Sequence, residues 1–238
     1  MGSAQPTASA MRLAWNKARI AALSTSNATR NQIRRLSKMT DKQRNRPDIG
    51  EIVRPRDLTI LSDNHYVLRN AEFDLQRRDG QWQRQRRESY DIGDGAAVLP
   101  IDRARSRVIL IRQFRWPAFE NGYRDTLIEA IAGKLDGDDP ERCVMKEAEE
   151  EAGLHVRNPR RVFYCFMSPG AVKERLSLFV ADYDSTAPRL KGGGSEQEGE
   201  DIETLELSTA DALDMVARGE IIDAKTIMLL QWAALNPA

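Results

Sequence analysis

The segment over residues 132–154, AGKLDGDDPERCVMKEAEEEAGL, constrains the fold of this chain more than any other stretch. An apolar strand over 126–131 leads into it, and a helix with well-marked ends follows an acidic turn. Asp139 suits the N-cap and Pro140 suits the first helical position, while Gly153 is placed to end the helix. The segment therefore predicts a strand, a turn and a helix in close succession.

Three glutamates on this helix have the spacing of neighbours on one face. Glu147 and Glu151 are four residues apart, and Glu147 and Glu150 are three apart. Like charges at these spacings repel by roughly 0.2–0.5 kcal/mol per pair. A divalent cation removes that repulsion, and Mg²⁺ prefers carboxylate oxygen. Taken alone, such a charge run also fits a solvated acidic face.

The same segment resembles the Nudix box, G-x5-E-x7-R-E-U-x-E-E-x-G-U, where U is aliphatic. The residues that match are Gly133, Glu147, Ala148, Glu150, Glu151, Gly153 and Leu154. Lys146 stands where the pattern has Arg, and the spacing from Gly133 to Lys146 is one residue short. Asp138 or Asp139 takes the place of the early Glu.

From Ile60 onward the chain is similar to one branch of the Nudix hydrolases, the GDP-mannose pyrophosphatases. The runs ILSDNHYVL, RRESYD, VILIRQFR, MSPGAVKE, GGGSEQEGEDIE and GEIIDAKT carry the similarity, in this order. The related ADP-ribose pyrophosphatases exchange an N-terminal sheet between two subunits. The resemblance therefore implies a homodimer whose N-terminal sheet packs on the neighbouring subunit.

The order of the expected elements predicts an α/β fold, a Nudix α/β/α sandwich with a mixed sheet and a small N-terminal antiparallel sheet. A hairpin turn is expected at 78–80, and a chain break at Trp116-Pro117. Further strands are expected over 96–101, 108–114, 162–167, 176–183 and 202–207, and helices over 208–218 and 223–235.

Three regions follow from these elements. Residues 1–55 are predicted to be a disordered basic tail and linker, 56–93 the N-terminal sheet used in dimerisation, and 94–238 the Nudix domain. The first 40 residues are basic, rich in Ser and free of acids, which also fits a transit peptide or a start at Met11 or Met39.

Composition excludes several classes of protein. The chain has 36 basic and 36 acidic side chains, so its formal net charge of +0 argues against a nucleic-acid partner. No apolar run approaches the roughly 20 residues of a membrane span. Two Cys and two His make neither a disulfide framework nor a multi-histidine metal site. We expect a cytoplasmic protein with no membrane partner.

The resemblance implies site residues by position. For Mg²⁺, with Mn²⁺ as the alternative ion, the ligands are the carbonyl of Ala132 and the carboxylates of Glu147, Glu151 and Glu200. The catalytic acids are Glu147, Glu150, Glu151 and Glu174. Nucleotide-sugar contacts fall on His65, Arg86, Arg87, Glu88, Arg115, Glu174 and Lys225. The arginines can neutralise a pyrophosphate with bidentate hydrogen bonds.

The implied reaction is hydrolysis of the diphosphate bond of a nucleotide sugar, with GDP-mannose giving GMP and mannose 1-phosphate. An ADP-ribose or broad nucleoside-diphosphate-sugar pyrophosphatase is the alternative. A nucleotide-binding regulator without activity is disfavoured, because a pure binder needs no three acids around a metal. Residues that could accept the proton from water are Glu174, Glu196, Glu198 and Glu200.

Overall fold

The structure is a computed structural model, and it describes residues 48–236. The prediction of a disordered tail over residues 1–40 lies outside this range. The chain forms two compact units. Of the described residues, one unit takes in 48–54 together with 74–84, and the other takes in 55–73 and 85–236. The predicted region boundaries at 55 and 93 stay a prediction.

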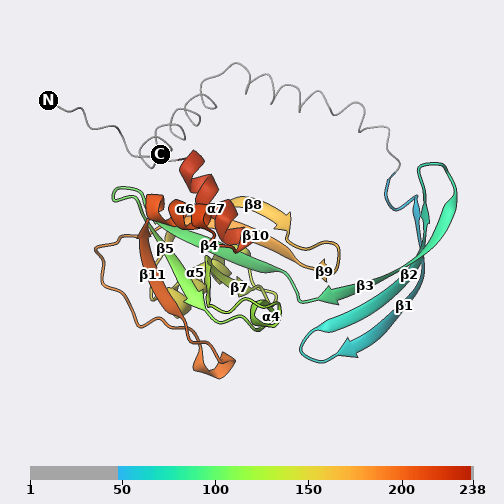
Figure 1. Cartoon of the computed structure of the whole chain (residues 1–238), viewed down its shortest axis with the longest axis horizontal. Coiled ribbons are helices and arrows are strands. Elements are labelled where there is room, and N and C mark those ends of the chain that lie inside the picture. The colour runs from blue at the N-terminus through green and yellow to red at the C-terminus, as the bar shows by residue number, and fades with distance from the viewer. Residues whose placement is uncertain (1–47, 237–238) are drawn as a thin grey trace, which may run out of the picture. The chain divides into compact units, whose positions relative to one another are not determined.

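A seven-stranded mixed sheet forms the centre of the larger unit (Figure 1). Its main path runs in the order β11-β5-β4-β10-β8, with β6 beside β5 and β7 beside β4. β4 and β10 are parallel, and the other described pairings are antiparallel. The strands are β4 (Gly95–Asp102), β5 (Arg107–Gln113), β6 (Leu127–Glu129), β7 (Ile131–Lys134), β8 (Arg157–Phe166), β10 (Arg175–Asp182) and β11 (Glu203–Ser208).

Helices cover both faces of this sheet, which confirms the predicted sandwich. The helices are α4 (Trp116–Glu120), α5 (Pro140–Ala152), α6 (Thr209–Arg218) and α7 (Ala224–Leu235), and a short 3₁₀ turn is η1 (Glu196–Glu198). The expected chain break at Trp116 is in fact the one-turn helix α4, which has Pro in its first turn. Ser208 caps α6 as predicted, since its hydroxyl accepts from the Asp211 backbone N–H at 3.0 Å.

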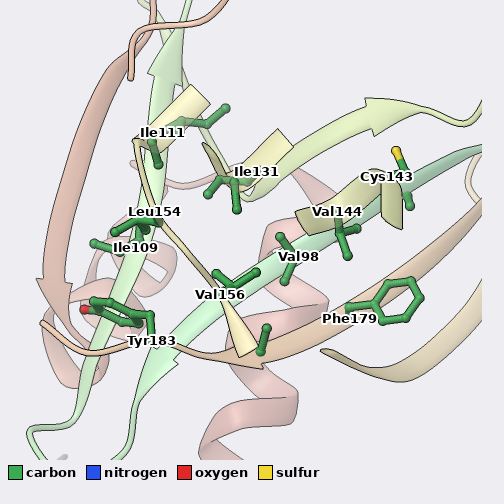
Figure 2. Close-up of a cluster of buried hydrophobic side chains, with 14 of the residues drawn as sticks. Val98, Ile109, Ile111, Ile131, Cys143, Val144, Leu154, Val156, Phe179 and Tyr183 are labelled. Carbon is green, nitrogen blue, oxygen red and sulfur yellow. The ribbon is translucent and has the colours of Figure 1, made fainter. Parts of the chain in front are cut away.

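Two apolar cores explain why the sheet is covered on both sides. Alternate strand residues point to opposite faces, so Val98, Ile109 and Ile111 pack with α5, while Leu99, Val108 and Leu110 pack with α6 and α7. Figure 2 shows the α5 side, where strand residues meet Cys143 and Val144 of the helix. The near-continuous burial of β4 and β5 follows from cover on both faces.

The expected single strand over 126–131 is two strands in the structure. β6 pairs with β5 and β7 pairs with β4, and Ala130 lies at the change of partner. There the backbone N–H of Ala130 donates to the hydroxyl of Thr226 at 2.6 Å instead of to a strand carbonyl. A buried N–H needs such a partner. The side chain of a distant helix thus stabilises the switch, and local sequence patterns do not reveal it.

Replacing Thr226 with Val should lower the free energy of unfolding by about 1–3 kcal/mol, because the buried Ala130 N–H loses its acceptor. Thr226 is fully buried, and Val has nearly the same shape. Denaturant unfolding measures the change. Thr186→Val is the matched control, since the Thr186 hydroxyl donates to Asp184 at the exposed surface. Equal stabilities for both variants would contradict this role of Thr226.

The N-terminal sheet is present, with one strand more than the sequence indicates. β1 (Val53–Asp63), β2 (Val67–Gln76) and β3 (Trp82–Asp91) are neighbours in that order. β9 (Val172–Lys173) then adds parallel to β3, with Tyr90 opposite Val172. The predicted turn lies between β2 and β3, where the Arg77 N–H donates to the Gln81 carbonyl at 2.8 Å. Within residues 48–236, no helix is long and apolar enough to cross a membrane.

Candidate active site

Helix α5 has the ends that the sequence predicts. The Asp139 carboxylate accepts from the backbone N–H of Glu141, Pro140 opens the helix, and Gly153 ends it in the left-handed conformation. The helix packs beside β7 so closely that a β-carbon on Gly133 would lie 2.1 Å from Glu147 Oε1. Glycine at this strand position is therefore what lets the Glu147 carboxylate lie against β7.

Glu151 is the most buried of the three helix glutamates. The residue is 2 % exposed, and its Oε2 accepts from the backbone N–H of Ala132 at 3.2 Å. Burial raises the pKa of Glu151 to about 9, and the charges of Glu147 and Glu200 add to the rise. A nearby cation would stabilise the ionised form of this buried acid.

Glu150 lies apart from the other two acids. Its carboxylate is exposed and forms an i,i+4 ion pair with Lys146 at 3.1 Å. The spacing predicts one shared helix face, and the structure adds that the three carboxylates differ in their surroundings. Glu147 and Glu151 face β7, whereas Glu150 lies at the solvent edge of the same face.

A glycine-rich loop brings a further acid, Glu200, near Glu147 and Glu151. The backbone N–H groups of Gly193 and Gly194 donate to the carbonyls of Glu151 and Glu150 at 2.9 and 3.0 Å. These carbonyls belong to the last turn of α5, which has no helical partners for them. The loop then turns back so that Glu200 Oε2 accepts from the Ser195 N–H at 2.9 Å. Glu200 lies close enough to Glu151 to raise its pKa.

Two cations near the acids share one buried carboxylate, that of Glu129. Arg115 follows β5, and its Nε donates to Glu129 Oε2 at 2.8 Å. Lys225, at the start of α7, donates to Glu129 Oε1 at 2.8 Å and to Asp223 at 3.0 Å. The charges of Glu151 and Glu200 also act on Arg115 and raise its pKa. Arg115 thus lies near Glu151 and Glu200 and shares the Glu129 carboxylate with Lys225.

Glu174 directly follows β9 and lies near enough to Lys225 for that charge to act on its carboxyl group. It is half-buried, and burial raises its pKa, although the nearby charge of Lys225 lowers it. Predicted residues from five separate segments therefore lie around one region: Glu147 and Glu151 on α5, then Glu200, Arg115, Glu174 and Lys225.

Comparison with known proteins agrees with this geometry. A model described as the NUDIX domain matches residues 92–230, and one described as the GDP-mannose pyrophosphatase NudK N-terminal domain matches 52–90. A protein from Cronobacter sakazakii named GDP-mannose pyrophosphatase is 50% identical over 178 residues, covering 74% of this chain and 92% of the relative. The chain belongs to the Nudix family, in the branch of the GDP-mannose pyrophosphatases.

Two further relatives bear the same name. The protein from Citrobacter koseri is 47% identical over 174 residues, which cover 73% of this chain and 90% of the relative. The protein from Klebsiella pneumoniae is 48% identical over 174 residues, which cover 73% of this chain and 87% of the relative. The chain thus matches nearly the full length of these Nudix proteins.

Nudix hydrolases generally use a divalent metal ion, and the donor set of this member fits one. Among the described residues, no three His, Cys, Asp or Glu side chains form a group that could hold a metal ion as they stand. Yet Glu147 lies against Gly133 while Glu151 binds the adjacent Ala132 N–H, and Glu200 raises the pKa of Glu151. Carboxylate oxygens crowded in this way are suited to a hard cation.

The N-terminal sheet carries the remaining predicted contacts. Arg86 Nε donates to the buried Asn70 at 2.7 Å, while Arg87 donates to Gln85 at 2.9 Å at the exposed surface. Glu88 is exposed. His65 is exposed, and the centroid of its ring lies 4.3 Å from that of Tyr66.

Sequence reasoning missed Glu129 and Asp223. Glu129 is 4 % exposed, and it joins the two predicted substrate cations. Asp223 caps α7 by accepting from the Thr226 N–H at 3.0 Å and also binds Lys225. The available signal for Glu129 was an acid inside the apolar run LIEAIAG, because a charge in a buried strand needs a partner.

Proposed function

We propose that this protein hydrolyses the diphosphate bond of GDP-mannose to GMP and mannose 1-phosphate with the help of Mg²⁺. The observation that carries the proposal is the position of Arg115. It lies near Glu151 and Glu200, and it shares an ion-pair partner with Lys225. Acids that suit a metal and cations that suit a diphosphate thus adjoin each other. The relatives' names supply the nucleotide sugar.

Each group has a distinct part in this proposal. Glu147, Glu151, Glu200 and the carbonyl of Ala132 would hold the ion. When bound, a divalent ion polarises phosphoryl oxygens and lowers the pKa of water. Arg115 and Lys225 would bind the diphosphate oxygens with charge-assisted hydrogen bonds. Glu174, Glu196 and Glu198 stay candidates for the group that accepts the proton from water, and single Gln variants distinguish them.

Metal-dependent product release from a panel of nucleotide sugars tests the function. The panel contains GDP-mannose, other GDP-sugars, UDP-glucose and ADP-ribose, with Mg²⁺ or Mn²⁺, and the products are separated by chromatography. We expect GMP and mannose 1-phosphate in equal amounts. We also expect the highest kcat/KM for GDP-mannose. A higher kcat/KM for ADP-ribose would support the alternative pyrophosphatase. Binding without hydrolysis of any member would support a regulator instead.

Assembly as a homodimer is the second part of the proposal. On β1, Leu58 and Ile60 are 63% and 56% exposed, and their spacing places them on one face of the strand. Exposed apolar side chains on a short sheet favour burial against a partner. A second copy of this chain is that partner in our proposal, with the exchanged N-terminal sheet. The cytoplasmic location stays a prediction.

Mixed dimers should recover activity if the site is shared between subunits. We propose that Arg86 and Arg87 of one chain join Glu147, Glu151 and Glu174 of the other. In a mixture of Arg87→Ala and Glu151→Gln chains, one site of each mixed dimer then has all its native groups. Activity should rise well above that of either variant alone. No recovery, with subunit exchange confirmed by differently tagged chains, would contradict the shared site.

A further inference from the structure

Glu129 is the common partner of two cations from distant parts of the chain. Its Oε2 accepts from Arg115 and its Oε1 accepts from Lys225, both at 2.8 Å. Arg115 lies between β5 and α4, whereas Lys225 lies in the first turn of α7. One carboxylate with one oxygen for each cation therefore fixes the separation of two side chains that no helix or strand holds together.

Burying these charges costs desolvation free energy, so stability alone does not explain the arrangement. The Glu129 carboxylate is 5% exposed and the Lys225 side chain 11%. Buried ion pairs give little net stability, because desolvation offsets most of the Coulomb attraction. An apolar residue at position 129 would suit the strand, since its neighbours Ile128 and Ala130 are buried. The charge at this position therefore points to a role in the site.

The hydrogen-bond pattern also leaves donors for a ligand. Arg115 uses Nε for Glu129, and within residues 48–236 its two terminal Nη groups have no hydrogen-bond partner. The Arg115 side chain is 40% exposed, so a ligand can reach it. Asp223 takes a second donor of Lys225 and is itself fixed as the N-cap of α7. Arg115 and Lys225 are thus both fixed by ion pairs to carboxylates, and each retains N–H donors that these bonds do not use.

We propose that Glu129 is a positioning residue, which holds Arg115 and Lys225 at the spacing needed to bind the two phosphate groups of the substrate. This inference rests on the proposed function, in which these two cations contact the diphosphate. Glu129 does not contact substrate or metal itself. Its effect is to lower the cost of ordering two long cationic side chains at each binding event.

The Glu129→Gln variant tests the role, because Gln retains the size but not the charge. We expect KM for GDP-mannose to rise roughly tenfold to a hundredfold, the range that corresponds to one lost hydrogen bond to a charged group. The Mg²⁺ dependence should not change, because Glu129 is no ligand. Glu129→Asp retains the charge but cannot reach both cations, so its KM should be intermediate. Glu220→Gln is the control, since Glu220 is ion-paired to Arg218 at the exposed end of α6.

Double variants separate positioning from a merely structural role. In the Arg115→Ala and Lys225→Met backgrounds, Glu129→Gln should cost far less than it does alone, because one of the cations it holds is absent. Equal losses in all backgrounds, or an unchanged KM in the single variant, would overturn the proposal.

Calorimetric binding of GDP keeps this test separate from the proposed hydrolysis. GDP presents the diphosphate without the sugar, and we expect the Gln variant to bind it at least about tenfold more weakly than wild type does. Equal GDP affinity in the two proteins would overturn the positioning role. Failure of wild type to hydrolyse any nucleotide sugar would contradict the proposed function alone.

Discussion

The Glu151→Gln variant should lose at least about a hundredfold in kcat, because residues that only support metal ligands already cost 10–100-fold when they are changed. Glu151 combines deep burial, a hydrogen bond from the Ala132 N–H and the nearby charges of Glu147 and Glu200. Gln preserves the shape and can still accept that hydrogen bond. What it removes is the negative charge that a divalent cation requires.

Unfolding measurements show whether this loss comes from the metal. Without metal, the Gln variant should be at least as stable as wild type at neutral pH, because the amide is neutral in both states, whereas the Glu151 carboxyl, with its pKa raised to about 9, must take up a proton on folding. Added Mg²⁺ should raise the melting temperature of wild type more than that of the variant. Glu149→Gln is the control, since Glu149 lies on the same helix but pairs with His155 at the surface. Wild-type kcat and an equal Mg²⁺ effect in Glu151→Gln would contradict the assigned role.

The parts of this protein that sequence predicts well are those fixed by neighbours along the chain. The ends of α5 follow from Asp139, Pro140 and Gly153, which act within a few residues of one another. Short continuous apolar runs likewise predict β4 and β5. These local signals, together with the resemblance to the Nudix box, predicted the fold, whereas the roles of the acids stay a prediction.

What sequence did not predict depends on contacts between distant segments. Thr226 binds the Ala130 N–H across 96 residues of chain, and this bond accompanies the division of one expected strand into β6 and β7. The ion pairs of Glu129 with Arg115 and Lys225 form only in the folded chain, because these residues lie in separate segments. β9 is only two residues long, and its pairing with β3 gives no periodic pattern. Such features follow from tertiary packing, which overrides local propensity.

The Gly133→Ala variant should lose roughly a hundredfold in activity while it remains nearly as stable as wild type. The added β-carbon would lie 2.1 Å from Glu147 Oε1 and 2.3 Å from its Cδ, so the carboxylate must move. These atoms end a flexible side chain, and Gly133 has no positive φ, so the backbone can accept alanine. The free energy of unfolding should therefore fall by less than about 1 kcal/mol, below the usual cost of overpacking a core.

Activity responds differently, because a displacement of about 1 Å at a catalytic group can cost a hundredfold in rate. Gly170→Ala is the matched control: its β-carbon would meet nothing within 4 Å, and its φ is also ordinary. Initial rates with GDP-mannose over a range of Mg²⁺ concentrations, with denaturant unfolding of each variant, measure both effects. Parent-level kcat in Gly133→Ala would show that the Glu147 carboxylate does not act from its place against β7. A loss of both stability and activity would instead show that the strand and α5 had separated.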